Sequence, residues 1–351
     1  MPLCSPNATF EDEYALDFLN FVRQLFQGVL VPLVCGIGTL LNAITFIVMT
    51  RRSMRTSSNM YLAANALCDG TYLACSLILG FEHEVPETAA FDIFRRLIPI
   101  FVSLIDFSQN CSVWLTVIYT TERYVAVCHP LQAKAICTVS RSLRTIAFCA
   151  ILCTVLTFPR LFEYSFVETG DPPIVCLTDS DLYRNITYQN VYFWLTVVLN
   201  TMIPFALLAF FNVKLIRAVR ESEKTRITLS QGRGDRSEAK ATIMCIAVVV
   251  LFLVCQTPSA CSLVLYRGKS DNLIKGLGNI FNFLVCLNAA GNFLLYCLFS
   301  PKYRATLFSL WETGCSGSQK DNGGYAPLSV FKSKNQVGYF IPSQLTKLDP
   351  R

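Results

Sequence analysis

Long apolar blocks separated by short polar segments dominate the chain. Each block reaches or exceeds the roughly 20 residues that an α-helix needs to cross the hydrocarbon core of a bilayer. Seven blocks can be marked, and they cover approximately residues 24–50, 58–81, 94–127, 142–162, 190–219, 239–266 and 273–299. The pattern therefore predicts an all-α membrane protein that folds as a seven-transmembrane helix bundle.

The segments at the two ends of the chain have different patterns. Residues 1–23 are polar and acidic, which predicts an extracellular N-terminus and no removable signal peptide. Residues 301–312 place apolar side chains, including Trp311, on one stripe above basic residues. This stripe predicts a short amphipathic eighth helix in the membrane interface. Residues 313–351 are rich in Gly, Ser, Pro and Lys and are expected to form a flexible cytoplasmic tail.

Composition agrees with a lipid environment. Charged residues make up 15% of the chain, whereas about 25% is usual in a soluble protein. The net charge of +6 does not indicate nucleic-acid binding, because the basic residues lie between the apolar blocks and not on one soluble face. Most of the 16 cysteines lie inside apolar blocks, and they are interpreted as small buried hydrophobic residues rather than metal ligands.

The distribution of basic residues predicts the orientation of the bundle. With the N-terminus outside, the inner segments carry about twice as many Lys and Arg residues as the outer ones, as the positive-inside rule requires. Two glycosylation sequons, at Asn7 and Asn185, then both lie outside. The chain is therefore expected to be a multi-pass protein of the plasma membrane with an extracellular N-terminus.

Polar residues inside the apolar blocks are the first candidates for a functional site. Asp69 lies midway along the second block, where a carboxylate is costly and usually functional. One interpretation gives it only a structural hydrogen bond between helices. Other polar residues lie at comparable places in the first, third and seventh blocks: Asn42, Ser112, Asn288 and Asn292.

These polar residues belong to a series of short motifs that occur in a fixed order. In chain order the series is Leu-Leu-Asn42, the Asp69 segment, Glu122-Arg123-Tyr124, Pro204, Phe252 to Pro258, and Asn292 to Tyr296. The series resembles the signature of rhodopsin-like G-protein-coupled receptors and covers about residues 24–312. The resemblance implies a receptor domain over this range that is not an enzyme. Its implied partners are membrane lipid, a heterotrimeric G protein and, as a further candidate, arrestin.

The resemblance also implies an ion site within the membrane. Asp69, Ser112, Asn288 and Asn292 match the positions of the family's sodium pocket. Their oxygen atoms suit a hard cation. An allosteric sodium ion is thus the one bound ion expected, and no other cofactor is.

The same resemblance implies an activation switch. Arg123 at the cytoplasmic end of the third helix is expected to pair with Glu122 and with Glu238 at the start of the sixth helix. Such a bridge holds a closed state if it biases the equilibrium by only a few kcal/mol. Pro258 is expected to kink the sixth helix, because proline removes a backbone hydrogen bond. The other implied relay positions are Val113, Pro204, Phe252, Gln256 and Tyr296.

A narrower resemblance comes from unusual positions in the series. Gln256 stands where most family members have Trp, and the fourth block ends Phe158-Pro-Arg-Leu-Phe-Glu163. This set resembles invertebrate FMRFamide and myosuppressin-type peptide receptors. It implies an extracellular neuropeptide ligand, of the basic, amidated RFamide-like kind.

Some positions depart from the family pattern. Phe293 replaces a proline of the seventh helix, which predicts a straighter backbone, and Asn212 stands where most members have Tyr. Ile98 occupies the position of a cysteine that normally pairs with the second outer loop, so Cys176 lacks its usual partner. Only Cys4 and Cys176 are clearly outside in the assigned topology, which suggests a Cys4–Cys176 disulfide. Two unpaired thiols are the alternative.

The outer segments suggest a ligand class because acidic residues outnumber basic residues there. One interpretation is a solvated, soluble surface, and the other is attraction of a cationic ligand. A peptide that ends in Arg-Phe-amide needs a carboxylate for its Arg and aromatic side chains for its Phe. Helix position suggests Glu82, Asp106 and Glu163 for charge, and Phe107, Tyr188, Tyr192 and Tyr266 for packing.

Other classes fit the sequence less well. An opsin needs a lysine where Cys286 stands, and an amine receptor needs an aspartate where Ile105 stands. A transporter is the remote alternative, and it is weakened because no internal repeat is visible. A receptor for another peptide class and an orphan chemoreceptor remain as alternatives.

Overall fold

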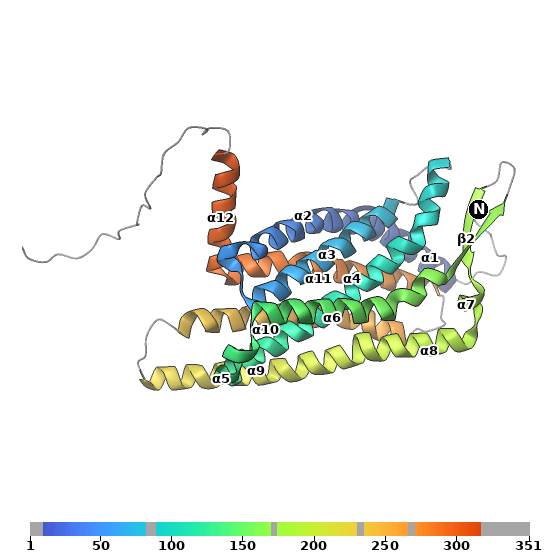
Figure 1. Cartoon of the computed structure of the whole chain (residues 1–351). Helices are drawn as coiled ribbons and strands as arrows, with labels where there is room; N and C mark the ends of the chain where they lie inside the picture. Colours follow the sequence, from blue (N-terminus) through green and yellow to red (C-terminus); the bar gives the residue numbers. More distant parts are fainter. Residues whose placement is uncertain (1–9, 82–88, 170–173, 230–234, 266–270, 317–351) are drawn as a thin grey trace, which may run out of the picture. The chain divides into compact units, whose positions relative to one another are not determined.

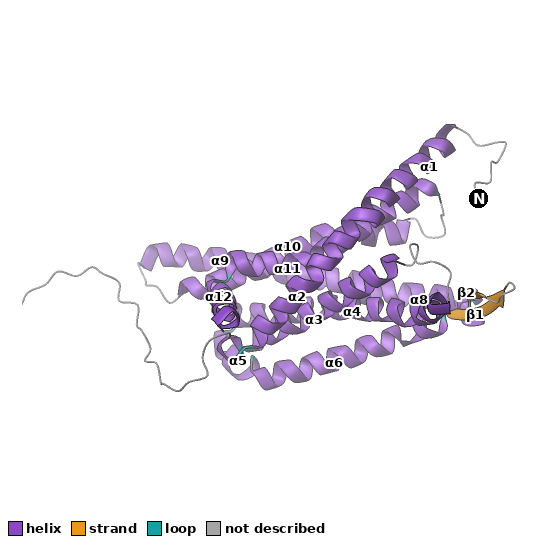
Figure 2. Cartoon of the chain, turned by 90° about the horizontal axis from the view of Figure 1, so that it is seen from above, coloured by secondary structure: helices purple, strands orange, loops and turns teal. Residues whose placement is uncertain are grey.

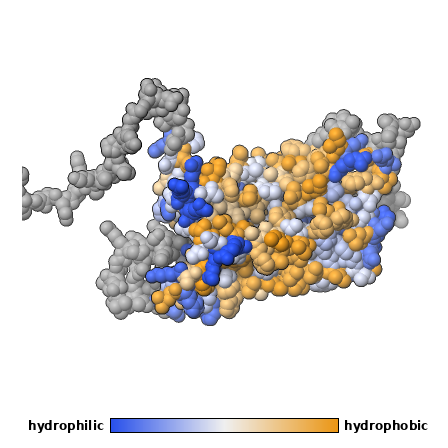
Figure 3. Space-filling model, viewed as in Figure 1, coloured by the Kyte–Doolittle hydropathy of each residue, from blue (hydrophilic) through white to orange (hydrophobic). Residues whose placement is uncertain are grey.

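The structure is a computed structural model that describes residues 10–81, 89–169, 174–229, 235–265 and 271–316. Within these residues seven helical spans are long and apolar enough to cross a membrane. The helices run side by side (Figure 1). Hydrophobic residues cover the middle of the visible face and hydrophilic residues gather toward its two ends (Figure 3). The predicted seven-helix membrane bundle is confirmed.

The element bounds show how each span is built. The first span joins α1 (Phe10–Val22), a π-helical segment η1 (Arg23–Leu30) and α2 (Val31–Thr50). The fifth span joins α8 (Ile186–Val197), a π-helical segment η5 (Val198–Met202) and α9 (Ile203–Leu229). The other elements are η2 (Arg52–Met54), α3 (Ser57–Gly80), α4 (Ala89–Cys128), α5 (Pro130–Ile136), α6 (Val139–Thr157), η4 (Phe158–Phe162), β1 (Tyr164–Thr169), β2 (Ile174–Asp179), α7 (Asp181–Arg184), α10 (Asp235–Leu265), α11 (Asn272–Phe299) and α12 (Pro301–Ser316).

The first helix begins much earlier than the sequence pattern predicted. It starts at Phe10, inside the segment expected to be a polar N-terminus. Leu19 and Val22 are buried, and the ring of Phe18 lies where a side chain on Gly276 would be, so α1 packs against α11. Acidic residues between the apolar positions conceal this helix in a hydropathy profile, but its apolar residues still recur at helical spacing.

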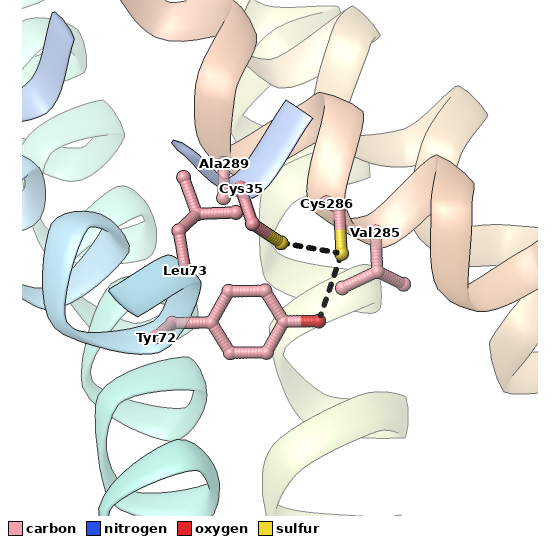
Figure 4. Close-up of a cluster of buried hydrophobic side chains, with 6 residues drawn as sticks. All are labelled: Cys35, Tyr72, Leu73, Val285, Cys286 and Ala289. Atoms are coloured by element: carbon pink, nitrogen blue, oxygen red, sulfur yellow. Dashed lines mark hydrogen bonds between the residues drawn. The ribbon is translucent and has the colours of Figure 1, made fainter. Parts of the chain in front are cut away.

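Close packing joins the first, second and seventh helices. A side chain at Gly38 would collide with Leu73 and Ala290, so glycine allows α2 to approach both neighbours. The Cys35 and Cys286 sulfur atoms are 3.9 Å apart, and the Tyr72 hydroxyl lies 3.7 Å from Cys286. Figure 4 shows these side chains in a cluster of buried apolar residues. The cysteines act here as small core residues, as the sequence predicted.

An eighth helix, α12, follows the seventh. Tyr303 at its start is completely buried, and its hydroxyl is 3.1 Å from Thr45 Oγ1 on α2. The rings of Phe293 and Tyr296 on α11 also contact Tyr303, with centroids 6.0 and 5.8 Å away. Phe293, which replaces the expected proline, thus helps to anchor the eighth helix.

A two-stranded hairpin is among the elements that the pattern of apolar blocks did not predict. Strands β1 and β2 are antiparallel, and Tyr164 pairs with Asp179 at the base. Figure 2 shows the hairpin at one end of the bundle. Two side chains of α4 bind the backbone of Val175: Arg95 donates to its carbonyl at 2.9 Å, and Asp92 accepts from its N–H at 3.2 Å.

Candidate functional site

A cavity of about 1030 Å³ opens among the outer halves of several spanning helices. Its volume is at the upper end of the usual range for small-ligand sites. Asp106 and Val113 of α4 line one side, and Phe252 and Gln256 of α10 line another. The remaining lining side chains come mainly from η4, the fifth span and α11. Among the described residues, the helices therefore supply most of the cavity lining.

One arginine lies between two carboxylates at this cavity. Arg160 Nε is 2.6 Å from Asp106 Oδ2, and Arg160 Nη1 is 2.7 Å from Glu163 Oε2. The guanidinium also lies 6.0 Å from the centre of the Tyr192 ring, within reach of a cation–π interaction. Arg160, Asp106 and Glu163 together carry a net charge of −1.

The tyrosines of α8 complete this charged cluster. The Tyr188 hydroxyl donates to Glu163 Oε1 at 2.9 Å. The Tyr188 and Tyr192 rings are stacked, with centroids 5.5 Å apart and planes 9° from parallel. Tyr192 donates to the Leu156 carbonyl at 3.0 Å. Burial raises the pKa of the adjacent Tyr164 phenol, although the Arg160 charge opposes this rise, so Tyr164 adds no charge at neutral pH.

Only some of the predicted ligand residues line the cavity in the part of the chain that the structure describes. Asp106, Glu163, Tyr188 and Tyr192 all line the cavity, whereas Phe107 is half-buried and is not among its lining residues. Glu82 and Tyr266 lie outside the described residues. Sequence reasoning missed Arg160 as a site residue. Its signal was a basic residue at the outer end of a spanning helix, within the motif that ends at Glu163.

The cavity floor is a packed apolar cluster. Val113 and Phe252 are buried with Val117, Leu208 and Val249. Phe205 contacts Phe252 with ring centroids 5.5 Å apart. Pro258 lies inside α10, and Gln256, on the same helix, lines the cavity above this floor. A ligand in the cavity therefore contacts the helices on which Pro204 and Pro258 lie.

Asp69 is the centre of a buried polar site deeper in the bundle. Its Oδ1 accepts from Ser112 at 2.6 Å, and its Oδ2 accepts from Asn292 and Asn65, both at 2.8 Å. Asn288 is buried on the same helix as Asn292, but the described hydrogen bonds do not join it to Asp69. Asn65 was not predicted, although it lies one helical turn before Asp69.

Two of the predicted switch residues, Glu122 and Arg123, lie beside the start of α3, at the end of the bundle opposite the hairpin. Glu122 accepts hydrogen bonds from Ser57, at 2.6 Å, and from Ser58, both at the start of α3. Arg123 donates to Ser58 and lies 3.6 Å from Glu122. The side chain of Glu238 lies outside the described residues, so the predicted Arg123–Glu238 bridge remains a prediction. Tyr296 is buried within the core.

The sequon and disulfide predictions concern the outer segments. Asn185 is exposed and caps α8, because its Oδ1 accepts from the backbone N–H groups of Thr187 and Tyr188. Asn7 and Cys4 lie outside the described residues. Cys176 lies on β2 beside Val175. The glycosylation sites and the Cys4–Cys176 bridge therefore remain predictions.

Seven spanning helices, an eighth helix and this series of polar motifs define the class as G-protein-coupled receptors. A sequence model of serpentine-type seven-transmembrane receptors, the Srw chemoreceptors, matches residues 29–314. The chain belongs to this family of G-protein-coupled receptors. The family consists of signalling receptors that cross the plasma membrane several times, and it is not an enzyme class.

Comparison with individual proteins identifies the receptors within this class to which the chain is similar. An FMRFamide receptor of Drosophila melanogaster is 32% identical over 315 residues, which are 86% of this chain and 57% of that receptor. An FMRFamide peptide receptor of Caenorhabditis elegans is 30% identical over 330 residues, or 89% of this chain and 76% of that receptor. The sex peptide receptor of Drosophila melanogaster is 26% identical over 82% of this chain and 72% of its own length. The predicted resemblance to FMRFamide-type receptors is confirmed.

Proposed function

We propose that this receptor binds an extracellular neuropeptide of the basic, amidated, RFamide-like kind and activates a heterotrimeric G protein. The observation that carries the proposal is the cavity in which Asp106, Glu163, Tyr188 and Tyr192 come together. Carboxylates suit the arginine of such a peptide, and aromatic rings suit its phenylalanine. Two relatives named as FMRFamide receptors support the same ligand class.

The charge of the cluster favours a cationic ligand over an anionic one. Asp106 and Glu163 carry two negative charges, and Arg160 offsets only one. A single ligand guanidinium would make this half-buried cluster neutral, which a neutral ligand cannot do. Low dielectric inside the cavity strengthens this preference.

A binding panel on intact cells tests the ligand class. We expect Phe-Met-Arg-Phe-amide to bind and to trigger a calcium or cAMP response, and the citrulline analogue, which lacks the charge, to bind much more weakly. Asp106→Asn should weaken binding of the amidated peptide, because the ligand guanidinium would then share the cavity with Arg160 and only one carboxylate. Equal affinity for the arginine and citrulline peptides would contradict a cation site.

The orientation and partners complete the proposal. We infer that the N-terminus is extracellular and that the end of the bundle with Glu122 and Arg123 faces the G protein. Basic residues are concentrated in the segments at that end, as expected for the cytoplasmic side. Arrestin would use the same face. Cleavage of a tag placed before Phe10, by protease added to intact cells, tests the orientation.

We further propose that Asp69 holds a sodium ion. The donor set fits, because the Asp69 carboxylate and the Ser112 hydroxyl supply oxygen atoms at one buried point. Asn65 Oδ1 is buried without a hydrogen-bond partner among the described residues, so a further oxygen is available beside Asp69.

A thermal-shift comparison in sodium and choline chloride tests this site without measuring signalling. Sodium at ten times its Kd should stabilise the receptor by about 1.4 kcal/mol and raise its Tm. The increase should vanish in Asp69→Asn and persist in Asp106→Asn, the matched control in the outer cavity. By linkage, sodium should also lower agonist affinity. Identical Tm values of the wild type in both salts would leave Asp69 a structural role only.

A further inference from the structure

The two carboxylates that bind Arg160 are not equivalent. Glu163 uses both oxygen atoms, one with Arg160 and one with Tyr188, and its side chain is only 3% exposed. Asp106 accepts from Arg160 with one oxygen only, and its side chain lines the cavity and is 28% exposed. Glu163 is thus a fully engaged structural group, whereas Asp106 remains accessible to a ligand.

We propose that Arg160 is an internal substitute for the ligand's cationic group. It occupies Asp106 in the receptor without ligand, and a ligand guanidinium takes over Asp106 while Arg160 stays with Glu163. This inference rests on the proposed function and adds to it a residue that determines affinity and specificity.

The geometry of the guanidinium allows this exchange. Arg160 uses Nε for Asp106 and Nη1 for Glu163, so one contact can break while the other persists. The contact with the Tyr192 ring also lies on the side of α8 and does not involve Asp106. The exchange replaces one guanidinium–carboxylate pair by another of the same chemistry. It therefore contributes little net free energy, and Arg160 lowers the affinity that a bare Asp106 would give.

The mechanism makes opposite predictions for two closely related variants. In Arg160→Met/Glu163→Gln, the internal cation and its structural partner are both replaced by neutral groups of similar size, which avoids a buried unpaired Glu163. Asp106 is then free for the ligand. In Glu163→Gln alone, Arg160 has lost its second carboxylate and should hold Asp106 more firmly.

Equilibrium binding of labelled Phe-Met-Arg-Phe-amide to surface receptor tests these predictions. The double variant should bind at least about tenfold more tightly than the wild type, which equals 1.4 kcal/mol, and Glu163→Gln should bind more weakly. Adding Asp106→Asn to the double variant should remove the gain, and the citrulline analogue should show no gain.

The possible failures are distinguishable. If the wild type does not bind the amidated peptide, the proposed ligand class and this inference are both wrong. If the wild type binds but the double variant, at normal surface expression, binds equally or more weakly, only the role of Arg160 falls. A gain that persists after Asp106→Asn would also overturn it, because the gain would then not depend on Asp106.

Discussion

Both amide atoms of Asn212 are buried in α9 without a hydrogen-bond partner among the described residues. Most relatives in the rhodopsin-like class are expected to have a tyrosine here. A buried polar group without a partner costs roughly 1–3 kcal/mol. Asn212 therefore destabilises this conformation relative to any conformation in which its amide is hydrogen-bonded.

We expect Asn212→Leu to stabilise the receptor in the present conformation by roughly 1–3 kcal/mol, because it removes the unsatisfied amide. The measurement is the Tm of purified receptor. Asn42→Leu is the matched control, because that buried amide donates to the carbonyls of Gly38 and Ala289 at 3.0 Å, and its loss should lower the Tm. If both variants lower the Tm, Asn212 has a partner that this conformation does not reveal.

Sequence reasoning found residues that one helix or one motif defines. Asp69, Ser112 and Asn292 come together as the resemblance implied, since depth along each helix fixes their level in the membrane. Arg160 was missed as a partner of Asp106, because that pairing depends on how two helices cross. The contacts of Glu122 with the start of α3 were missed for the same reason.

At the scale of elements, the bilayer explains what could be predicted. Its thickness sets a helix length, so the spanning helices appeared as apolar blocks. The early start of the first helix did not appear as an apolar block, because α1 mixes acidic residues with its buried apolar ones. The hairpin was missed because its strands Tyr164–Thr169 and Ile174–Asp179 are short and partly polar.

The hairpin is held to α4 by side chains, at the residue next to Cys176. Ile98 stands where the resemblance implied a cysteine, and on the same helix Arg95 and Asp92 bind the backbone of Val175. Val175 is buried, so these hydrogen bonds are shielded from water. Arg95 and Asp92 thus form a polar clamp that holds the hairpin to α4 at the residue next to Cys176.

We expect Arg95→Met to loosen the hairpin and increase hydrogen exchange in its amides, measured by mass spectrometry. Arg96→Met is the matched control, because the Arg96–Glu168 pair is largely exposed, at 51% and 62%. Exposed pairs contribute only about 0–1 kcal/mol. Equal exchange in both variants would show that the clamp does not hold the hairpin.

At the scale of the whole molecule, signalling requires the outer cavity to influence the opposite end of α10. Phe252 packs at the cavity floor, and Glu238 lies near the start of the same helix. Arg123 is already held by Ser58 and Glu122 in this structure. The proposed Arg123–Glu238 bridge would add a further restraint on α10.

We expect Glu238→Ala to raise signalling without ligand, because α10 loses that restraint, as measured by basal cAMP or calcium at matched surface expression. Arg123→Ala should abolish the agonist response while peptide binding persists. Unchanged basal signalling in Glu238→Ala would exclude the bridge, and a normal agonist response in Arg123→Ala would exclude the role of that arginine.

The sulfur contact between Cys35 and Cys286 joins the first spanning helix to the last. Both thiols are completely buried, so a membrane-permeant alkylating reagent can react with them only while these two helices separate. The alkylation rate of Cys35 and Cys286 therefore reports helix separation without an engineered label. Comparing this rate with and without peptide, by peptide mapping of the receptor, would measure how often the two helices part in living cells.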